Sequence, residues 1–281
     1  MAHVRTARRA CVQDACHHEE SAVPKLAANI KFLFNEFDFL DRFAAAAAAG
    51  FKGVEYQTPY EHDTQVLRKK LHENQLTFVL LNLPSGNPHA GDRGIACHPD
   101  RIAEFEAGVD LAIEYANALG CTLANCIAGI RPPGLDPVVA RATLVRNLRY
   151  AAPRFKAAGV RLLIEAINPR DIPGFFLNDT TQAIDIIRDV GSDNVFVQYD
   201  MYHMQITQGD QAPTIEKHLK QIAHMQLADT PGRHEPGTGE INYTFLLDFI
   251  DRIGYTGWIG CEYVPAGTTI AGLGWASRYL R

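Results

Sequence analysis

The sequence has no long hydrophobic run, no strong excess of one charge and no nucleotide-binding glycine signature. Its apolar runs fall short of the roughly 18–20 residues that cross a bilayer, so no membrane partner is expected. The formal net charge of -5 is mild, whereas a nucleic-acid partner calls for a basic surface. No Gly-x-Gly-x-x-Gly follows the first predicted strand, so no nucleotide cofactor is expected.

Cysteine is sparse, with six residues scattered over 281. The start of the chain also lacks the apolar centre of a secretory signal. In a chain of this length such cysteines are typical of free thiols in a reducing compartment, which predicts a cytoplasmic location.

The first 22 residues differ from the rest because they show no hydrophobic periodicity. We expect residues 1–22 to form a disordered extension that the protein can lose without harm to its stability or activity. Residues 23–281 are predicted to form a single domain.

Strand-like and helix-like periods alternate from about residue 26 onward. Eight units in about 250 residues match a closed (β/α)8 TIM barrel of the α/β class. An open doubly wound sheet is the alternative, and the missing glycine signature disfavours it. The expected strands cover residues 28–34, 53–57, 77–83, 122–129, 161–168, 195–200, 223–229 and 257–263. The expected helices cover residues 39–50, 64–75, 102–119, 137–158, 180–191, 213–222 and 243–255.

Four of the later strands end on an oxygen-bearing side chain: Glu165, Asp200, Gln226 and Glu262. A parallel barrel collects side chains from the carboxyl ends of its strands into one cup. Each acid taken alone could instead pair with a Lys or Arg, or cap the next helix. An all-oxygen ligand set favours Mg²⁺ or Mn²⁺ over zinc, so we expect a divalent metal site formed by these four residues.

Four further residues lie near the expected strand ends. His203 and Arg233 fall on loops at the barrel mouth and are expected to contact substrate, Arg233 by binding a carboxylate. Their alternatives are a structural imidazole and a solvated loop charge. Glu55 and Asn82 could also line the cup, and the sequence does not decide between lining and structural roles. Two long loops, Pro84–Arg101 and Asp229–Asn242, are predicted to border the site.

The chain resembles the hydroxypyruvate isomerase family within the xylose-isomerase-like barrel superfamily, from about Lys25 to Trp275. The marks of the resemblance are FLDRFAAAAAAGFKGVEY, NLPSG with AGDRGIA, LLIEAIN with DIPGFFL, QYDMYHMQ, ADTPGRHEPGTGEINY and GWIGCEY with AGLGW. The resemblance implies that Glu165 and Glu262 are the catalytic acid/base pair, and that they surround a divalent metal together with Asp200 and Gln226. Related sugar epimerases and isomerases usually have histidine where this chain has Gln226.

The resemblance implies an isomerase that interconverts hydroxypyruvate and tartronate semialdehyde through an enediolate. The substrate is then a small hydroxy-oxo acid, and assembly of identical subunits is compatible with this assignment. The family also includes 2-oxo-tetronate isomerases, whose substrate is one carbon longer. Two other classes remain as alternatives, a barrel-type endonuclease and a non-catalytic sugar-acid-binding protein.

Overall fold

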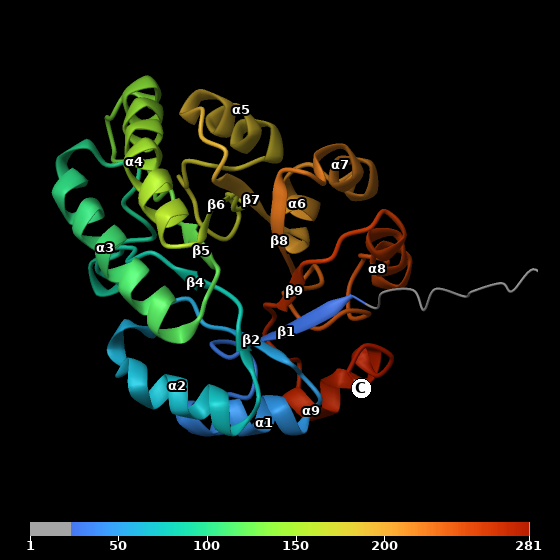
Figure 1. The fold of residues 1–281 in the computed structure, drawn as a ribbon. Coiled ribbons are helices and arrows are strands. Elements are labelled where there is room, and N and C mark those ends of the chain that lie inside the picture. Colours follow the sequence, from blue (N-terminus) through green and yellow to red (C-terminus); the bar gives the residue numbers. More distant parts are fainter. Residues whose placement is uncertain (1–23, 281) are drawn as a thin grey trace, which may run out of the picture.

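The computed structural model describes residues 24–280, and the extension expected for residues 1–22 lies outside the described residues. A single parallel sheet occupies the centre of the molecule (Figure 1). Its order is β3-β2-β1-β9-β8-β7-β6-β5-β4, and every pairing is parallel. The strands are β1 Lys25–Asn29, β2 Gly53–Glu55, β3 Thr77–Phe78, β4 Leu81–Asn82, β5 Leu123–Cys126, β6 Arg161–Glu165, β7 Val195–Asp200, β8 Ile222–Leu227 and β9 Trp258–Cys261.

The third predicted strand is divided into two short strands that close the barrel. Its first half pairs with β2, since the amide of Val79 donates to the carbonyl of Val54 at 2.8 Å. The amide of Asn82 still reaches the carbonyl of Gln57 at 3.0 Å, and one residue later the amide of Leu83 donates to the carbonyl of Asn125 at 2.9 Å. This segment therefore bridges β2 and β5, and the predicted TIM barrel is confirmed.

Helices surround the sheet (Figure 1). Each presents apolar residues at helical spacing to the strands; α5, for example, buries Ala183, Ile186 and Val190. The side chain of Asp179 caps this helix by accepting from the amide of Gln182 at 2.8 Å. The helices are α1 Arg42–Ala48, α2 Thr64–Glu73, α3 Ile102–Leu119, α4 Pro137–Ala157, α5 Thr180–Val190, α6 Met201–Thr207, α7 Gln211–His218, α8 Tyr243–Arg252 and α9 Thr269–Gly272.

The short helix α6 was not expected from the sequence. It begins directly after β7, where the side chain of Asp200 accepts a hydrogen bond from the amide of Tyr202 at 2.8 Å. Asp200 thus caps the next helix, one of the alternatives to a role in the site that the sequence leaves open. Its second carboxylate oxygen, Oδ2, takes no part in this hydrogen bond. Because α6 begins directly after β7, His203 lies at the carboxyl end of the barrel.

The first strand begins and ends earlier than predicted, at Lys25 and Asn29 instead of residues 28 and 34. The apolar run continues past Asn29, but the backbone turns, because the carbonyl of Asn29 accepts from the amides of Phe32 and Leu33 at 3.1 and 2.8 Å. Phe34 takes a left-handed conformation with φ 61° and is fully buried. The prediction failed here because the run packs as a turn against the barrel wall.

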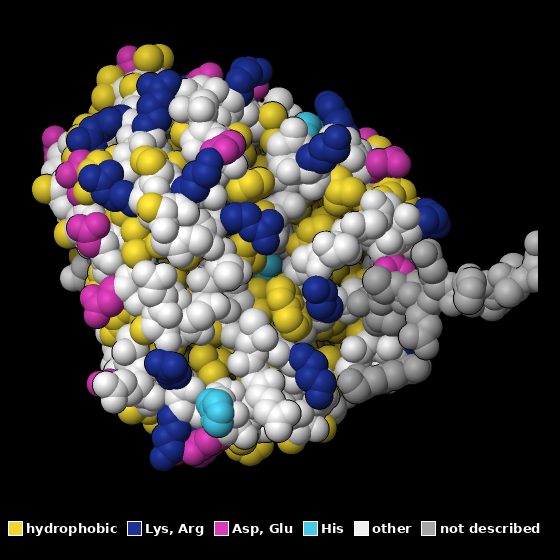
Figure 2. Space-filling model, viewed as in Figure 1, with side chains coloured by type: hydrophobic (Ala, Val, Ile, Leu, Met, Phe, Trp, Pro, Cys, Tyr) yellow, Lys and Arg dark blue, Asp and Glu magenta, His cyan; other side chains and the backbone are white. Residues whose placement is uncertain are grey.

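The barrel interior changes from apolar to polar along its axis. A small apolar cluster fills one part of it: Ala27, Val79, Leu80, Leu123, Leu163 and Ala223. Buried polar side chains fill the part toward the strand carboxyl ends, among them Asn29, Glu55, His224 and Gln226. The outside carries Lys and Arg side chains in separate groups among hydrophobic and neutral ones over the face in Figure 2. Within residues 24–280, none of the helices combines the length and apolar character that crossing a bilayer requires.

Candidate active site

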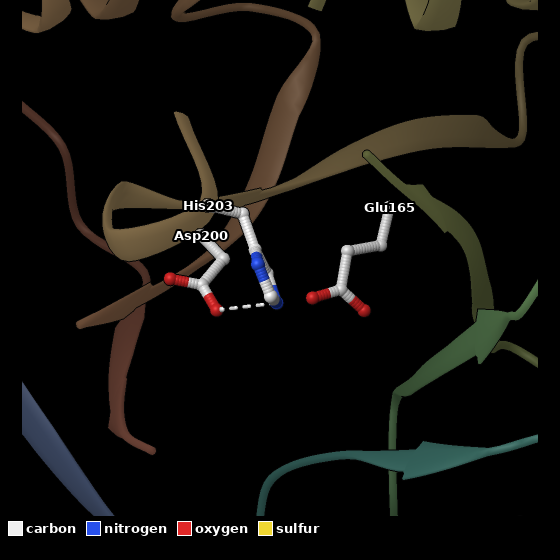
Figure 3. A group of neighbouring side chains, drawn as sticks. All are labelled: Glu165, Asp200 and His203. Carbon is white, nitrogen blue, oxygen red and sulfur yellow. Dashed lines mark ion pairs between the residues drawn. The ribbon is translucent and has the colours of Figure 1, made fainter. Parts of the chain in front are cut away.

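Three predicted site residues meet at the carboxyl end of the barrel. Glu165 ends β6, Asp200 ends β7, and His203 lies in the first turn of α6. Their side chains point toward one another (Figure 3), and one ligand atom from each lies within 4.8 Å of the others. The imidazole Nε2 of His203 is 3.5 Å from Oδ2 of Asp200. The sequence prediction that strand ends assemble one cup is consistent with this geometry.

His203 is a neutral hydrogen-bond donor in this arrangement. Burial lowers its pKa to about 3, and the charge of Arg233 acts in the same direction. The Nδ2 amide of Asn168 lies 2.7 Å from its Nδ1, and the amide of Asp171 donates to the other end of Asn168 at 2.8 Å. Because Asn168 is thereby oriented as the donor, Nδ1 of His203 accepts and Nε2 carries the proton toward the cup.

Arg233 lies among the acids of the cup. Its Nη2 is 2.7 Å from Oε2 of Glu262 and 3.7 Å from Oδ2 of Asp200, and its Nη1 is 3.9 Å from Oδ2 of Asp171. The rings of Phe32 and Tyr202 lie 5.2 and 5.0 Å from the guanidinium carbon. Burial alone would lower the pKa of Arg233, but the neighbouring carboxylates outweigh it and raise the pKa. The cation is therefore fixed in place and much of its charge is balanced by the protein.

The two glutamates expected to transfer protons are both buried and have raised pKa values. Burial raises the pKa of Glu262 to about 7, against the opposing charge of Arg233. Burial also raises the pKa of Glu165 well above its ordinary range, and repulsion from Glu262 and Asp200 adds to that shift. Amides hold both carboxylates: Asn125 donates to Glu165 at 2.8 Å, and Asn29 donates to Glu262 at 3.3 Å. Glu262 can therefore hold or release a proton near neutral pH, and the protonated form of Glu165 is favoured more than in an exposed glutamate.

The cup opens into a cavity of about 640 Å³. Glu165, Glu262, His203 and Arg233 all line it, and so does Asn82. Both predicted long loops contribute, the first through residues between Pro84 and Arg93 and the second through Arg233. Apolar side chains also line the cavity: Phe32, Pro84, Leu111, Ile127, Ile167 and Ile172. A pocket with convergent polar groups at one end is typical of a small-molecule site.

A profile of proteins with the xylose isomerase-like TIM barrel matches residues 43–279. The chain belongs to this family. It is 49% identical to the hydroxypyruvate isomerase of Escherichia coli over 255 residues, which are 91% of this chain and 99% of that protein. It is 46% identical to the 2-oxo-tetronate isomerase of Cupriavidus necator over 92% of this chain and 99% of that protein. Membership confirms the predicted family and the predicted enzyme class, an isomerase.

Two solved structures agree with the fold. A protein from Brucella melitensis, described as an AP endonuclease of family 2, superimposes with a TM-score of 0.90 at 42% identity, over 92% of this chain and all of that one. An L-ribulose 3-epimerase superimposes with a TM-score of 0.72 at 22% identity, over 92% of this chain and 88% of that one. The second likeness supports the barrel architecture alone.

Gln226 and Glu55, unlike the residues above, face each other inside the barrel. Gln226 is fully buried, its Oε1 accepts from Nε2 of Gln198 at 2.6 Å, and its Nε2 donates to Glu55 at 2.7 Å. Glu55 also accepts from Asn29 at 2.9 Å and lies 2.7 Å from Nε2 of His224. Neither Gln226 nor Glu55 is among the residues that line the cavity. Glu55 therefore has a structural position, while Asn82 lines the cup.

Sequence reasoning missed the amides and the histidine that hold the site. Gln57 donates to Glu262, and His224 contacts Glu55. Strand alternation carries a signal for both, because Gln57 lies two residues after Glu55 and His224 two residues before Gln226, so each pair shares the inward face. Asn29 and Asn125 carry no comparable signal, since a single Asn near a strand end is common.

The donor set of the cup fits a hard divalent cation. Among the described residues, the buried carboxylates of Glu165, Asp200 and Glu262 lie around the guanidinium of Arg233. Oδ2 of Asp200 is buried and accepts no hydrogen bond in this part of the chain. Excess carboxylate charge with a free oxygen is the chemistry that such a cation stabilises.

Proposed function

We propose that the protein interconverts hydroxypyruvate and 2-hydroxy-3-oxopropanoate, with Glu165 and Glu262 as the proton-transfer pair. The observation that carries the proposal is the pair itself: both glutamates are buried, both line one cavity, and both have raised pKa values. The 49% identity to a hydroxypyruvate isomerase supports the choice of substrate.

The reaction moves one proton between neighbouring carbons. A carboxylate takes a proton from C3, the hydroxyl-bearing carbon, and leaves an enediolate in which C2 and C3 share the double bond. A proton is then delivered to C2, while the hydroxyl proton passes from the oxygen on C3 to the oxygen on C2. Glu165 and Glu262 supply the base and its partner acid, and their burial raises the basicity of the carboxylate form.

The neighbouring donors stabilise the charge that develops on the substrate oxygens. The Nε2 proton of His203 points into the cup, and Arg233 offers guanidinium hydrogens from a fixed position. We place both residues in contact with substrate. Fixed donors in a site that excludes water act without reorganisation during the reaction.

We also propose that Glu165, Asp200, Gln226 and Glu262 hold Mg²⁺ or Mn²⁺. Such an ion, when bound, would supply positive charge to the substrate oxygens. Binding by Gln226 requires its Oε1 to leave, or to share, the hydrogen bond from Gln198. This requirement favours moderate affinity over tight binding.

A four-carbon 2-oxo-tetronate is the second candidate substrate, on the basis of the 46% identical relative. The cavity volume of about 640 Å³ admits either acid, so volume does not separate them.

Proton exchange measured by NMR in D₂O tests the proposal with both acids. Wild type is expected to place deuterium on carbon, and Glu165→Gln and Glu262→Gln are each expected to lower kcat by at least about 100-fold. The kcat of the double variant should be only slightly below that of the less active single variant, because the two residues act as a unit.

Glu240→Gln is the matched control, since Glu240 is an exposed loop acid, and it should keep wild-type kcat. If either site variant retained near-normal kcat and exchange, that glutamate would be structural. If wild type bound the acids without any exchange, the protein would be a binding protein instead.

A further inference from the structure

Three cationic side chains line the cavity: Lys31, Arg93 and Arg233. An acid substrate brings a negative charge into a cup that already holds several carboxylates, so its binding depends on a cation whose charge is not already balanced. Arg233 is a poor source of net charge, because Glu262 lies at 2.7 Å and Asp200 at 3.7 Å from its Nη2. It can still donate hydrogen bonds to substrate.

Arg93 is directed toward its own loop. Its Nη1 donates to the carbonyl of Asp92 at 2.7 Å and lies 3.5 Å from the carbonyl of Pro88. These two contacts hold the guanidinium at the exposed outer part of the cavity. Movement of the Arg93 guanidinium into the cavity would break both hydrogen bonds.

Lys31 differs from Arg233, because no carboxylate among residues 24–280 lies within ion-pairing distance of its ammonium group. Arg93 shares this lack of an ion pair, but two carbonyls of its own loop hold its guanidinium. The backbone of Lys31 is nevertheless firmly placed just past the end of β1. The amide of Lys31 donates to Oδ1 of Asn29 at 3.2 Å, and Nδ2 of the same Asn29 donates to Glu262 and Glu55. The side chain is exposed and long, so the ammonium can move while its base stays fixed.

The position of Lys31 relates it directly to the catalytic end of the cavity. Its charge is among those that oppose the rise in the pKa of Glu262, which places the ammonium within electrostatic reach of that carboxylate. Lys31, Glu165 and Glu262 line the same cavity.

We propose that Lys31 is a substrate-binding residue that takes the carboxylate of the 2-oxo or 2-hydroxy acid and makes the site select acids over uncharged sugars. The inference rests on the proposed function and refines it: Arg233 and His203 contact oxygens near the reacting carbons, and Lys31 supplies the unbalanced positive charge. A flexible lysine suits this role, because one ammonium can follow the carboxylate of a three-carbon or a four-carbon acid.

Steady-state kinetics of four variants test the inference. Lys31→Gln should raise KM for hydroxypyruvate about tenfold with kcat within about twofold, which is the scale of one lost charge-assisted hydrogen bond. Lys31→Arg should restore most of the loss. Arg93→Gln, which removes the other unpaired cation of the cavity, should change KM by less than about threefold, and Lys52→Gln, outside the cavity, should change nothing.

Dihydroxyacetone serves as the uncharged comparison, because a hydroxymethyl group replaces the carboxylate of hydroxypyruvate. Its KM, or its inhibition constant if it does not turn over, should be equal for wild type and Lys31→Gln. An equal tenfold rise in KM, or in the inhibition constant, for both compounds would show that Lys31 affects the shape of the site but does not bind the carboxylate. This result would overturn the inference.

Calorimetric titration with glycerate, a three-carbon hydroxy acid that cannot isomerise, keeps the inference testable apart from catalysis. Lys31→Gln should weaken glycerate binding about tenfold, and it should do so even if the proposed isomerisation proved wrong. An unchanged affinity in Lys31→Gln, or no binding of glycerate to wild type, would overturn the inference. Turnover of hydroxypyruvate with unchanged KM in Lys31→Gln would overturn it and leave the proposed function standing.

Discussion

At the scale of single residues, burial decides how the acids of the cup behave. Glu165 and Glu262 keep hydrogen-bond donors, yet both pKa values rise because water is excluded and other carboxylates are close. His203 moves the opposite way and stays neutral, since burial disfavours its charged form as well. The same desolvation therefore favours the protonated form of the glutamates and the neutral form of the histidine, which are the forms that the proposed mechanism uses.

The raised pKa of Glu262 predicts a pH-dependent cost to stability in metal-free protein. Its folded pKa is about 7, against an unfolded value near 4.3. The folded state thus holds a proton that the unfolded state has lost between these values, and stability falls as pH rises through this window. Glu262→Gln removes the titration, so its Tm relative to wild type should increase from pH 5 to pH 8.

Thermal unfolding with a chelator present measures this difference, and Glu240→Gln should show no comparable trend. The absolute Tm is less informative, because the variant also alters the contact with Arg233. A relative Tm that stayed constant from pH 5 to pH 8 would mean that Glu262 is ionised throughout this range in the folded protein.

At the scale of elements, the loop after β8 holds Arg233 in place through Asp229. This fully buried carboxylate accepts from the amides of Thr230 at 2.9 Å, Gly237 at 2.9 Å and Ile241 at 3.1 Å. The loop then closes onto itself, since a Cβ on Gly239 would lie 2.3 Å from the carbonyl oxygen of Thr230. One acid thus sets the path of the segment that carries the arginine of the cup.

Asp229→Asn is expected to loosen this loop and weaken catalysis together. The side-chain amide of asparagine has only one acceptor oxygen, so its NH₂ group would face a backbone N–H that the second carboxylate oxygen of Asp229 now accepts from. Leaving that N–H without an acceptor should cost about 2 kcal/mol of unfolding free energy. We expect kcat/KM to fall at least about tenfold, because small displacements of a positioning loop are costly. Denaturant unfolding and steady-state kinetics measure the two effects.

Asp136→Ala provides the comparison for a loss of stability alone. Asp136 caps α4 by accepting from the amide of Val138 at 2.8 Å, and it does not line the cavity. This variant should lose about 1 kcal/mol of stability with unchanged kcat/KM. If Asp229→Asn behaved in the same way, the loop would not position the site.

The helices and strands were predictable from sequence wherever the hydrophobic periodicity extended over many residues. The helices 102–119 and 137–157 and the strand 195–200 lie within a residue of their predicted limits. The strand predicted over residues 161–168 begins at Arg161 as expected but ends at Glu165. The first strand was misplaced because the apolar run 30–34 does not reveal that the carbonyl of Asn29 turns the chain. Apolar side chains are buried equally well by a strand and by a packed turn.

The candidate site was predictable for the residues that end strands, and less so for those that hold them. An acid after an apolar strand is conspicuous, whereas the roles of Asn29, Asn125 and Asn168 depend on side chains that are distant in sequence. Glu55 looked equivalent to the other acids, but its partner His224 is 169 residues away. Local patterns carry no information about such pairs. The assignment of Gln226 as a metal ligand stays a prediction.

At the scale of the whole molecule, the barrel concentrates negative charge on its axis. The acids and bases of the chain nearly balance, with a net charge of -5 over 281 residues, but the described interior gathers the carboxylates of Glu165, Asp200 and Glu262 near Arg233. Closing a parallel sheet brings every strand end to one mouth, and here several of those ends are acidic. A bound cation, or protons on the carboxylates, would reduce the repulsion between these buried charges.

Divalent ions should therefore stabilise the folded protein as a whole. Mg²⁺ or Mn²⁺ at millimolar concentration should raise Tm, by mass action on the native state, and removal by a chelator should reverse the shift. Asp200→Asn should abolish most of the shift, because it removes the charge behind the one buried carboxylate oxygen that accepts no hydrogen bond in the described chain.

Gln226→His should increase zinc or cobalt affinity, since imidazole suits those ions better than an amide oxygen does. Titration calorimetry separates the outcomes: no heat and no Tm shift with any of these ions, for wild type and for Gln226→His alike, would remove the metal from the mechanism. The enediolate would then depend on Arg233 and His203 alone, and the excess charge of the cup would be carried by protons on Glu165 and Glu262.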